Sequence, residues 1–387
     1  MAPDFLIVGA GLAGAAAAAQ LSRLGSVLII EQGATPASEA SAQNAGLIRR
    51  LDAEPCDRAL AQRTMRFLVD EAIAWGKVPL SARTGAILGL VRDPLWLTNA
   101  RSHLHAEGAT VESIDPGDVP VLKDSPVIAA WHLPDERVCN GSELAKAMLN
   151  VAQQRGAQLH CKEAARALLL QAGQVVGVQT DKASHYAGHV VLAGGAWAQG
   201  LAQTAGIRRP LFTLRRTAAV VAATVQPGRQ QPWIWLDDVG VYAKPESPHW
   251  LVSPCNEHRE DPPNGPGSTG VPSTEDWRLT AAKVQRYFPA LGPIEPVRSW
   301  TGLRTFVPDR RPLIGEDEDA PGLWWAGALG GSGLSTCWGV AEALTTLIEG
   351  RELTWLDPAA VNPSRPQLSR WPIFTDGDPQ RARLIDG

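Results

Sequence analysis

The chain has 387 residues, of which 44% are hydrophobic and 20% charged, and its formal net charge at pH 7 is -4. This length and composition predict a globular protein of two or three domains with a large buried core. The negative charge argues against a nucleic-acid-binding protein, which needs basic residues for phosphate contacts. No apolar run is long enough to span a bilayer, and no basic segment precedes the first apolar run, so we expect no transmembrane segment, no signal peptide and a cytoplasmic location. Five widely spaced cysteines fit a reducing compartment.

The N-terminal residues have the pattern of a βαβ unit. A β-rich run at residues 4–8 is followed by a glycine-rich turn, an alanine-rich helix former at 15–24 and a second apolar run at 26–31. Such a unit with glycines at its first turn is typical of dinucleotide-binding proteins.

The glycines of this turn have the spacing of a dinucleotide-binding motif. Gly9 would permit the tight turn, Gly11 the approach of a pyrophosphate, and Gly14 the packing of the helix on the strand. Glu31 ends the second strand, where its carboxylate can accept hydrogen bonds from ribose hydroxyls. We therefore expect an adenine dinucleotide.

The rest of the chain alternates between predicted helices and strands. The spacing of apolar residues predicts helices over 56–76, 96–109, 141–157 and 274–289. Ser142 is the expected N-cap of the third of these helices. Predicted strands cover 84–92, 174–180, 189–195 and 216–224.

A second strand, glycine-rich loop and helix occupy residues 322–350, far from the first motif. The N-terminus of this helix, aimed into the same domain, would stabilise negative charge on a reduced flavin ring. This feature favours FAD over NAD.

Three segments in this order resemble the D-amino-acid-oxidase-like superfamily of FAD-dependent amine and amino-acid oxidoreductases. They are "FLIVGAGLAG" with "VLIIE", "VVLAGGAWAQGLAQTAGI", and "WTGLRTFVPDRRPLIG" with "GLWWAGALGGSGLS". The resemblance covers the chain to about residue 350. Within the superfamily, "LRRTAAVV" and "GLRTFVPD" are most similar to D-arginine-dehydrogenase-like members.

The resemblance implies an α/β fold, with a glutathione-reductase-type Rossmann FAD-binding domain and an interleaved α+β substrate domain built on an antiparallel sheet. The FAD-binding domain would comprise 1–80, 140–210 and 298–355, and the substrate domain 81–139 and 211–297. Residues 356–387 would form a Pro-rich C-terminal tail.

The resemblance also implies the residues that hold FAD. The bond to FAD would be non-covalent, because the segment after "GLRT" has no cysteine. The turn at 41–46 would run beneath the flavin ring. The implied residues are Gly9, Gly11, Ala13, Gly14, Glu31, Gln32, Ser41, Ala42, Gln43, Asn44, Ala45, Gly46, Ala165, Gly194, Gly195, Trp197, Arg304, Gly330, Gly331, Ser332, Gly333, Leu334 and Ser335.

In the family, an arginine at the position of Arg304 grips the substrate carboxylate, a task that suits a bidentate guanidinium. Tyr242 would donate its hydroxyl at the same pocket. One of two adjacent arginines would approach the same carboxylate, since a strand points neighbours to opposite faces. The implied catalytic residues are Arg304, Tyr242, Arg49 and Asn44, and further substrate contacts are Arg50, Arg216, Arg215, Asn256 and Gly331.

Two departures from the D-arginine-dehydrogenase pattern concern the substrate side chain. Gly85 stands where those enzymes have an acid, and Asn44 and Arg49 stand where they have His and Tyr. A pocket that loses an acid and gains an arginine should disfavour a cation. We expect a substrate with a second anionic group: D-aspartate, D-glutamate, or an N-substituted glycine such as iminodiacetate. The alternative is that Arg49 and Arg50 pair with acids at a surface or interface.

The implied reaction is hydride transfer from the substrate α-C–H to flavin N5, with oxygen or a quinone or other carrier as the final acceptor. An FAD-dependent oxidase or dehydrogenase of 2-hydroxy acids such as L-2-hydroxyglutarate is the alternative enzyme. A third, non-enzymatic hypothesis is a flavin-binding subunit without its own substrate. No metal is expected, since the close histidine pairs, His103 with His105 and His185 with His189, lack further ligands at suitable spacing.

Overall fold

The computed structural model describes residues 2–75, 79–92, 101–102, 104–106, 108–228, 231–268 and 270–369. Half of the residues of the helix predicted over 96–109 lie outside the described ranges, as does the tail beyond residue 369. Within this part of the chain no helix is both long and apolar enough to cross a membrane.

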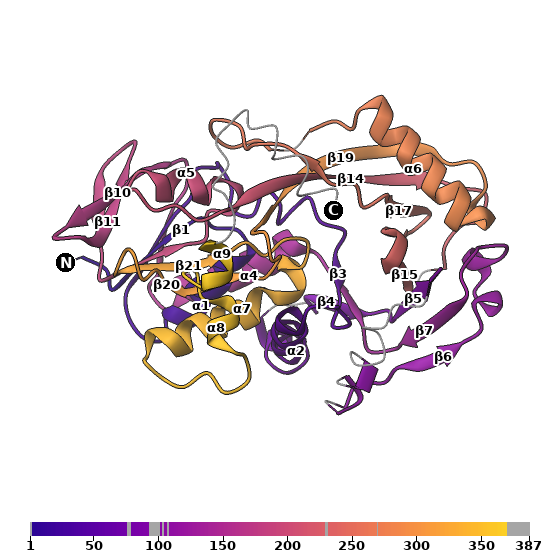
Figure 1. Cartoon of the computed structure of the whole chain (residues 1–387), viewed down its shortest axis with the longest axis horizontal. Coiled ribbons are helices and arrows are strands. Elements are labelled where there is room, and N and C mark those ends of the chain that lie inside the picture. Colours follow the sequence, from indigo (N-terminus) through magenta and orange to yellow (C-terminus); the bar gives the residue numbers. More distant parts are fainter. Residues whose placement is uncertain are drawn as a thin grey trace.

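A six-stranded sheet forms the centre of one half of the molecule (Figure 1). Its strands are parallel except for β20, and the two predicted motif strands, β1 and β2, pair in register. In spatial order they are β20 (Leu313–Glu316), β21 (Leu323–Gly327), β13 (His189–Leu192), β1 (Phe5–Val8), β2 (Val27–Ile30) and β9 (Gln158–His160).

The alternation of side chains along β1 separates two buried layers. Phe5 and Ile7 point into a helical layer formed by α1 (Leu12–Leu21), α2 (Pro55–Asp70), α4 (Gly141–Gln154) and α7 (Gly333–Ile348). Leu6 and Val8 point into the opposite layer, which contains a three-stranded antiparallel sheet and a short helix. These elements are β10 (Ala165–Gln171), β11 (Gln174–Thr180), β12 (Ser184–Tyr186) and α5 (Ala198–Gln203).

The alanine run explains how α1 fits its place. Nine of its ten residues are buried, because α1 packs against the parallel sheet and both α4 and α7. A helix that is covered on all sides needs small side chains all round rather than one apolar stripe.

The other half of the molecule is a nine-stranded, mainly antiparallel sheet covered by α6 (Thr274–Tyr287) (Figure 1). Its longest strands, β14 and β19, pair along most of their length. The strands are β5 (Ala86–Leu90), β6 (Glu112–Ile114), β7 (Ala129–Leu133), β14 (Phe212–Ala222), β15 (Trp233–Leu236), β16 (Val241–Glu246), β17 (His249–Ser253), β18 (His258–Arg259) and β19 (Glu295–Phe306).

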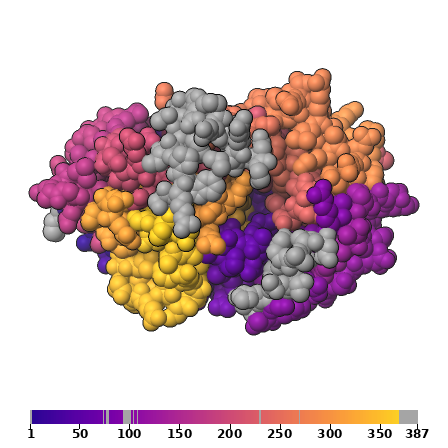
Figure 2. Space-filling model, viewed as in Figure 1, coloured from indigo at the N-terminus to yellow at the C-terminus, as the bar shows by residue number. Residues whose placement is uncertain are grey.

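Shorter elements complete the described chain. A small sheet joins β3 (Leu47–Ile48), β8 (Arg137–Cys139) and β4 (Ser81–Arg83). Single helical turns lie at η1 (Ala72–Trp75), η2 (Pro116–Asp118), η3 (Pro120–Leu122), η4 (Gly195–Trp197), η5 (Asp237–Val239) and η6 (Pro289–Leu291), and the tail holds α8 (Pro358–Val361) and α9 (Pro366–Ser369). In Figure 2 the tail helices and α7, in yellow, and residues around 110–140, in purple, lie at opposite ends of one face.

The predicted α/β fold with a parallel and an antiparallel sheet is confirmed. One local expectation is wrong. The N-cap of α4 is Asn140, whose side chain accepts from Glu143 N–H, and not Ser142, which donates to the Ala37 carbonyl instead. The expected boundary at 298 falls inside β19, which pairs with β14, so we propose that the substrate domain extends to Phe306.

Candidate active site

A cavity of about 640 Å³ lies between the two halves of the molecule. Both predicted glycine-rich segments line it, together with the turn at 41–46 and residues of β14 and β19. Among the predicted cofactor residues, only Gly14 and Ala42 are absent from its wall.

The first glycine motif leaves no space for larger residues. A Cβ on Gly9, whose φ is +102°, would lie 2.5 Å from the Ala193 carbonyl oxygen, and one on Gly14 would lie 1.9 Å from the Gly9 oxygen. Gly14 therefore brings α1 against β1 and does not contact the cavity, which is the packing role expected for the third glycine. The N-terminus of α1 faces the cavity through Gly11, Leu12 and Ala13, as an anion site requires.

Glu31 is fixed at the end of β2 by backbone donors. Its Oε2 accepts from Ala10 N–H at 2.8 Å and its Oε1 from Gly33 N–H at 2.7 Å. The carboxylate is 9% exposed and lines the cavity. These contacts hold a carboxylate acceptor where a ribose diol would bind, so the residues present fit an adenine dinucleotide.

The second helix N-terminus faces the same cavity. Residues 330–335, which include the N-cap of α7, Ser332, line the wall. The Ser332 hydroxyl donates to Asp57 Oδ2 at 2.7 Å. Burial, and after it the neighbouring Asp52, raise the pKa of Asp57 to about 7. Two helix N-termini therefore point into one cavity, which is the arrangement that favoured FAD from the sequence.

Asn44 uses its side chain to shape the turn at 41–46. Its Nδ2 donates to the Ser41 carbonyl at 2.6 Å and its Oδ1 accepts from Gly46 N–H at 2.8 Å. Gly46 has φ +77°, which suits glycine. Asn44 lines the cavity, but its amide is already occupied on both sides, so its place is to hold the turn.

The register of β14 and β19 explains which arginine faces the cavity. Leu214 lies opposite Arg304, and Arg216 lies opposite Gly302. Arg216 and Arg304 are therefore diagonal neighbours on one face. The missing side chain of Gly302 makes room for Gln43, whose Oε1 would lie 2.4 Å from a Cβ there. Both arginines line the cavity. The Gly331 position lies beside them: a Cβ there would be 3.3 Å from Arg304 Nη1.

Arg215 and Asn256 lie outside the cavity wall, which corrects their predicted substrate contacts. The side chain of Arg215 points to the other face and pairs with Asp276 at 2.7 Å and Glu260 at 2.8 Å. Asn256 is 6% exposed and its Nδ2 donates to Asp276 Oδ1 at 2.8 Å and Thr217 Oγ1 at 3.1 Å. Strand alternation thus sends Arg215 to a structural network behind the site, and Asn256 joins this network from the loop between β17 and β18.

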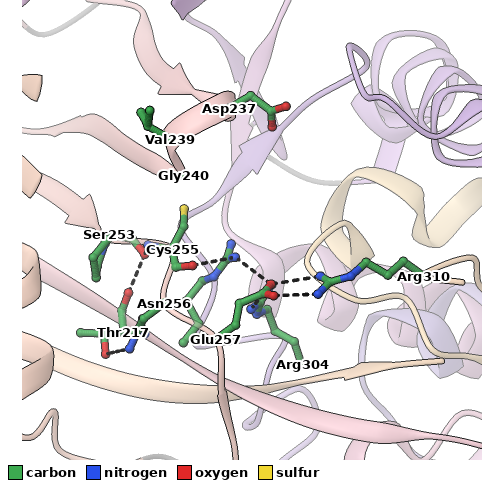
Figure 3. A network of polar contacts seen from close by, with 12 residues as sticks. Thr217, Asp237, Val239, Gly240, Ser253, Cys255, Asn256, Glu257, Arg304 and Arg310 are labelled. Atoms are coloured by element: carbon green, nitrogen blue, oxygen red, sulfur yellow. Dashed lines mark hydrogen bonds and ion pairs between the residues drawn. The ribbon is translucent and has the colours of Figure 1, made fainter. Parts of the chain in front are cut away.

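One carboxylate serves three arginines at this end of the cavity. Figure 3 shows the side chain of Glu257 between Arg304, at 3.1 Å, and Arg310, at 2.7 Å, and Arg216 lies 3.5 Å from it. The Arg310 hydrogen bond and the nearby guanidiniums outweigh burial and lower the pKa of Glu257 to about 2. Burial and the proximity of Arg216 lower the pKa of Arg304 to about 9. The cluster has an excess of positive charge, and its inner members face the cavity.

Arg49 lines the cavity but is not a free cation. It forms ion pairs with Asp52 and with Asp237, the latter at 3.4 Å, and its guanidinium lies 4.4 Å from the ring centroid of Trp235. Against the effect of burial, these carboxylates raise the pKa of Arg49. Arg49 therefore combines the two alternatives stated for it, because it lies at the pocket and also pairs with acids.

Arg50 does not line the cavity, which corrects its predicted substrate contact. It is 5% exposed, and its Nε donates to Glu136 Oε1 at 2.9 Å. Gly85 is also absent from the wall, and its N–H donates to the Glu136 carbonyl. The loss of an acid at position 85 therefore says nothing about this pocket.

Tyr242 lines the cavity from β16. Its ring stacks on Trp235, the residue opposite it on β15, with centroids 5.2 Å apart. Burial raises the pKa of the phenol to about 12, so it stays a hydrogen-bond donor at neutral pH.

The residues of this arrangement that were not predicted from the sequence include Glu257, Asp57, Trp235 and Asp237. Asp57 lies in the first turn of a predicted helix, where an acid has an ordinary role at the helix dipole. Glu257 follows Asn256 at the start of a segment rich in proline and glycine. Their partners lie far away in sequence, so spacing offered no signal.

Comparison with known proteins supports this architecture. Residues 4–347 match the family model "DAO: FAD dependent oxidoreductase". The mitochondrial pyruvate dehydrogenase phosphatase regulatory subunit of Mus musculus is 25% identical, over 88% of this chain but 40% of that protein. Glycine oxidase of Geobacillus kaustophilus is 25% identical, over 84% of this chain and 86% of that protein.

Solved structures share the fold. L-Proline dehydrogenase from P. horikoshii superimposes with a TM-score of 0.82 at 22% identity, covering 94% of this chain and 97% of the other. Iminodiacetate oxidase from a Chelativorans species gives a TM-score of 0.76 at 23% identity, covering 93% and 98%. The similarity to D-arginine-dehydrogenase-like members stays a prediction. The predicted cofactor and enzyme class are confirmed: the chain belongs to the DAO family of FAD-dependent oxidoreductases, whose cofactor is FAD.

Proposed function

We propose that this protein oxidises a small amino or imino acid whose carboxylate is bound by Arg304 and Arg216. The observation that carries this proposal is the pair of guanidiniums on one face of the β14–β19 ladder, in a cavity that also holds both helix N-termini. Charge-assisted and bidentate contacts make such a pair a strong carboxylate site. The DAO family relationship, and the glycine oxidase relative with its amino-acid substrate, support the same class.

The chain's own residues would orient the substrate. FAD, when bound, supplies the acceptor for the hydride that leaves the substrate carbon. Arg304 and Arg216 would fix the carboxylate, and the buried Tyr242 hydroxyl would donate a further hydrogen bond. Orientation of a neutral amine would then carry most of the rate enhancement.

The proposed substrate carries a second carboxylate, and the residues that we propose to bind it differ from the one predicted from the sequence. Asp52 and Asp237 already balance Arg49, so that residue is a weak partner for a second anion. The Arg216–Arg304 cluster has the excess charge instead, because Glu257 is the one carboxylate that its three arginines share in the described chain. A diacid such as iminodiacetate would use this excess.

Anaerobic bleaching of the flavin in the purified protein tests the proposal. The substrates to compare are glycine, sarcosine, iminodiacetate, D-aspartate, D-glutamate, D-arginine and L-2-hydroxyglutarate. We expect amino or imino acids to bleach the flavin, with iminodiacetate or an acidic amino acid the fastest. Bleaching by 2-hydroxyglutarate alone would replace this proposal with the hydroxy-acid reaction. Bleaching by none of them would support the non-catalytic flavin subunit.

A further inference from the structure

Two histidines and one buried glutamate converge away from the arginines, where β9 of the parallel sheet meets the sheet of β10, β11 and β12. His160 Nδ1 lies 3.2 Å from Glu163 Oε2, and His185 Nε2 lies 2.6 Å from Glu163 Oε1. One potential ligand atom from each residue lies within 4.8 Å of the others. Spacing along the chain concealed this group, because 22 residues separate Glu163 from His185.

The chemistry and geometry of these side chains suit a transition metal. Two imidazole nitrogens and one carboxylate oxygen form the ligand set of many zinc sites that complete their coordination with water. The His160 and His185 rings lie 5.8 Å apart at 72°, so they approach the carboxylate from different directions. The two histidines are only partly exposed, which leaves a path for an ion.

The carboxylate is held ready by its own partners. Glu163 is 4% exposed, and its Oε1 accepts from Thr180 Oγ1 at 2.7 Å. Its backbone N–H donates to the Glu31 carbonyl at 3.0 Å. Supporting hydrogen bonds of this kind orient metal ligands. The pair of His132 and Glu112 lacks these features, because it has only one imidazole and its acid is 55% exposed.

We propose that His160, Glu163 and His185 bind one divalent transition metal ion of the zinc class. The ion would tie the end of β9 to β12 across the segment that leads into Ala165 and Arg166, two residues of the cavity wall. The ion would have a structural role. It would stabilise the end of the cavity that lies far from the arginine cluster. The proposal is independent of the substrate proposed above.

Titration calorimetry with zinc sulfate, on flavin-loaded protein freed of metal by a chelator and dialysis, tests this site. We expect one ion per chain and a rise in Tm on zinc addition, because binding to the folded state alone stabilises it. The visible absorption of bound Co²⁺ gives an independent readout of nitrogen ligation.

Three variants locate the site. His160→Ala and His185→Ala should each weaken zinc binding by more than about tenfold. Removal of a residue that only supports a metal ligand already costs about that much, and these variants remove a ligand itself. His185→Gln retains a donor for Glu163 and guards against loss of folding. His132→Ala and Cys161→Ser are the controls and should bind zinc as the wild type does. Absence of stoichiometric binding, equal affinity in the His160 and His185 variants, or loss of binding in Cys161→Ser would each overturn the proposal.

Discussion

The two ends of the cavity achieve anion binding by different means. The end at β1 and α1 is built from backbone, in which Gly9 and Gly14 fit because no Cβ could, and Glu31 is held by two amide groups. The end at β14 and β19 is built from side chains. Its arginines form ion pairs with carboxylates from distant segments of the chain. A site formed by backbone groups can be predicted from the local sequence, whereas a site formed by distant side chains is defined only by the fold.

The largest effect should come from the backbone end. Gly14→Ala places a Cβ about 1.9 Å from the Gly9 carbonyl oxygen, which forces α1 away from β1. Overpacking of this kind destabilises a protein by roughly 1–3 kcal/mol or more. We expect the variant to lose most of its FAD and to unfold at a lower temperature, as measured by the flavin-to-protein absorbance ratio and Tm.

Gly200→Ala is the matched control for that change. Gly200 also lines the cavity, but a Cβ there meets nothing within 4 Å, and the residue lies in α5 where alanine favours the helix. It should retain flavin. Equal flavin loss in both variants would mean that any change at a cavity glycine suffices and that the close packing of α1 on β1 is not the cause.

The next effect belongs to the side-chain end. Arg304→Ala and Arg216→Ala should each lower kcat/KM for the best substrate by about 100-fold, the loss expected for one charge-assisted contact of roughly 3 kcal/mol. The flavin content of Arg216→Ala should stay close to that of the wild type. Steady-state kinetics measures this effect on whichever substrate bleaches the flavin.

Arg298→Ala provides the control on the same strand. Arg298 lies in β19 with a side chain that is 63% exposed, so its removal should leave kcat/KM within about twofold, as surface changes usually do. If Arg304→Ala behaved like Arg298→Ala, the carboxylate would not bind at this cluster.

A smaller effect concerns stability and pH at the N-terminus of α7. Burial and the proximity of Asp52 raise the pKa of Asp57 from 3.8 in the unfolded chain to about 7, so between these pH values the folded state holds a proton that the unfolded state has released. The contribution of Asp57 to stability is therefore present below about pH 4 and is lost as the pH rises to 7. Asp57→Asn removes this dependence.

Urea denaturation of wild type and Asp57→Asn from pH 4 to pH 8 measures that difference. The free energy of unfolding of the wild type, relative to the variant, should decline with rising pH and then level off above about 7. A difference that does not change with pH would show that Asp57 titrates like an exposed acid.

The smallest effect should follow Arg49→Ala. Since Asp52 and Asp237 already neutralise this guanidinium, the KM for a diacid should change by less than about fivefold, far less than for Arg304→Ala. The measurement compares KM for a diacid and for glycine. A selective rise of more than tenfold for the diacid would restore Arg49 as the partner of a second carboxylate.

The comparison also shows how far the sequence could be read. The βαβ unit, the second helix terminus and Arg304 were predicted, because glycine spacing and a local signature mark them. The assignment of Arg215 and Arg216 was open, since alternation gives opposite faces but not which face is inward. The position of Arg50 outside the cavity wall could not be predicted, because its partner, Glu136, lies 86 residues away. Glu257 and the His160–Glu163–His185 group were missed for the same reason: tertiary structure alone brings them together.

The position of Glu257 has a consequence for how tightly a substrate binds. Under the proposed function, an incoming carboxylate would compete with Glu257 for Arg304 and Arg216, which would lower the net attraction. In return, the two guanidiniums wait in ordered positions, and binding loses little of their rotational freedom. On the proposed function, this internal anion would lower affinity while it preserves the geometry, a compromise that would suit easy release of a carboxylate product.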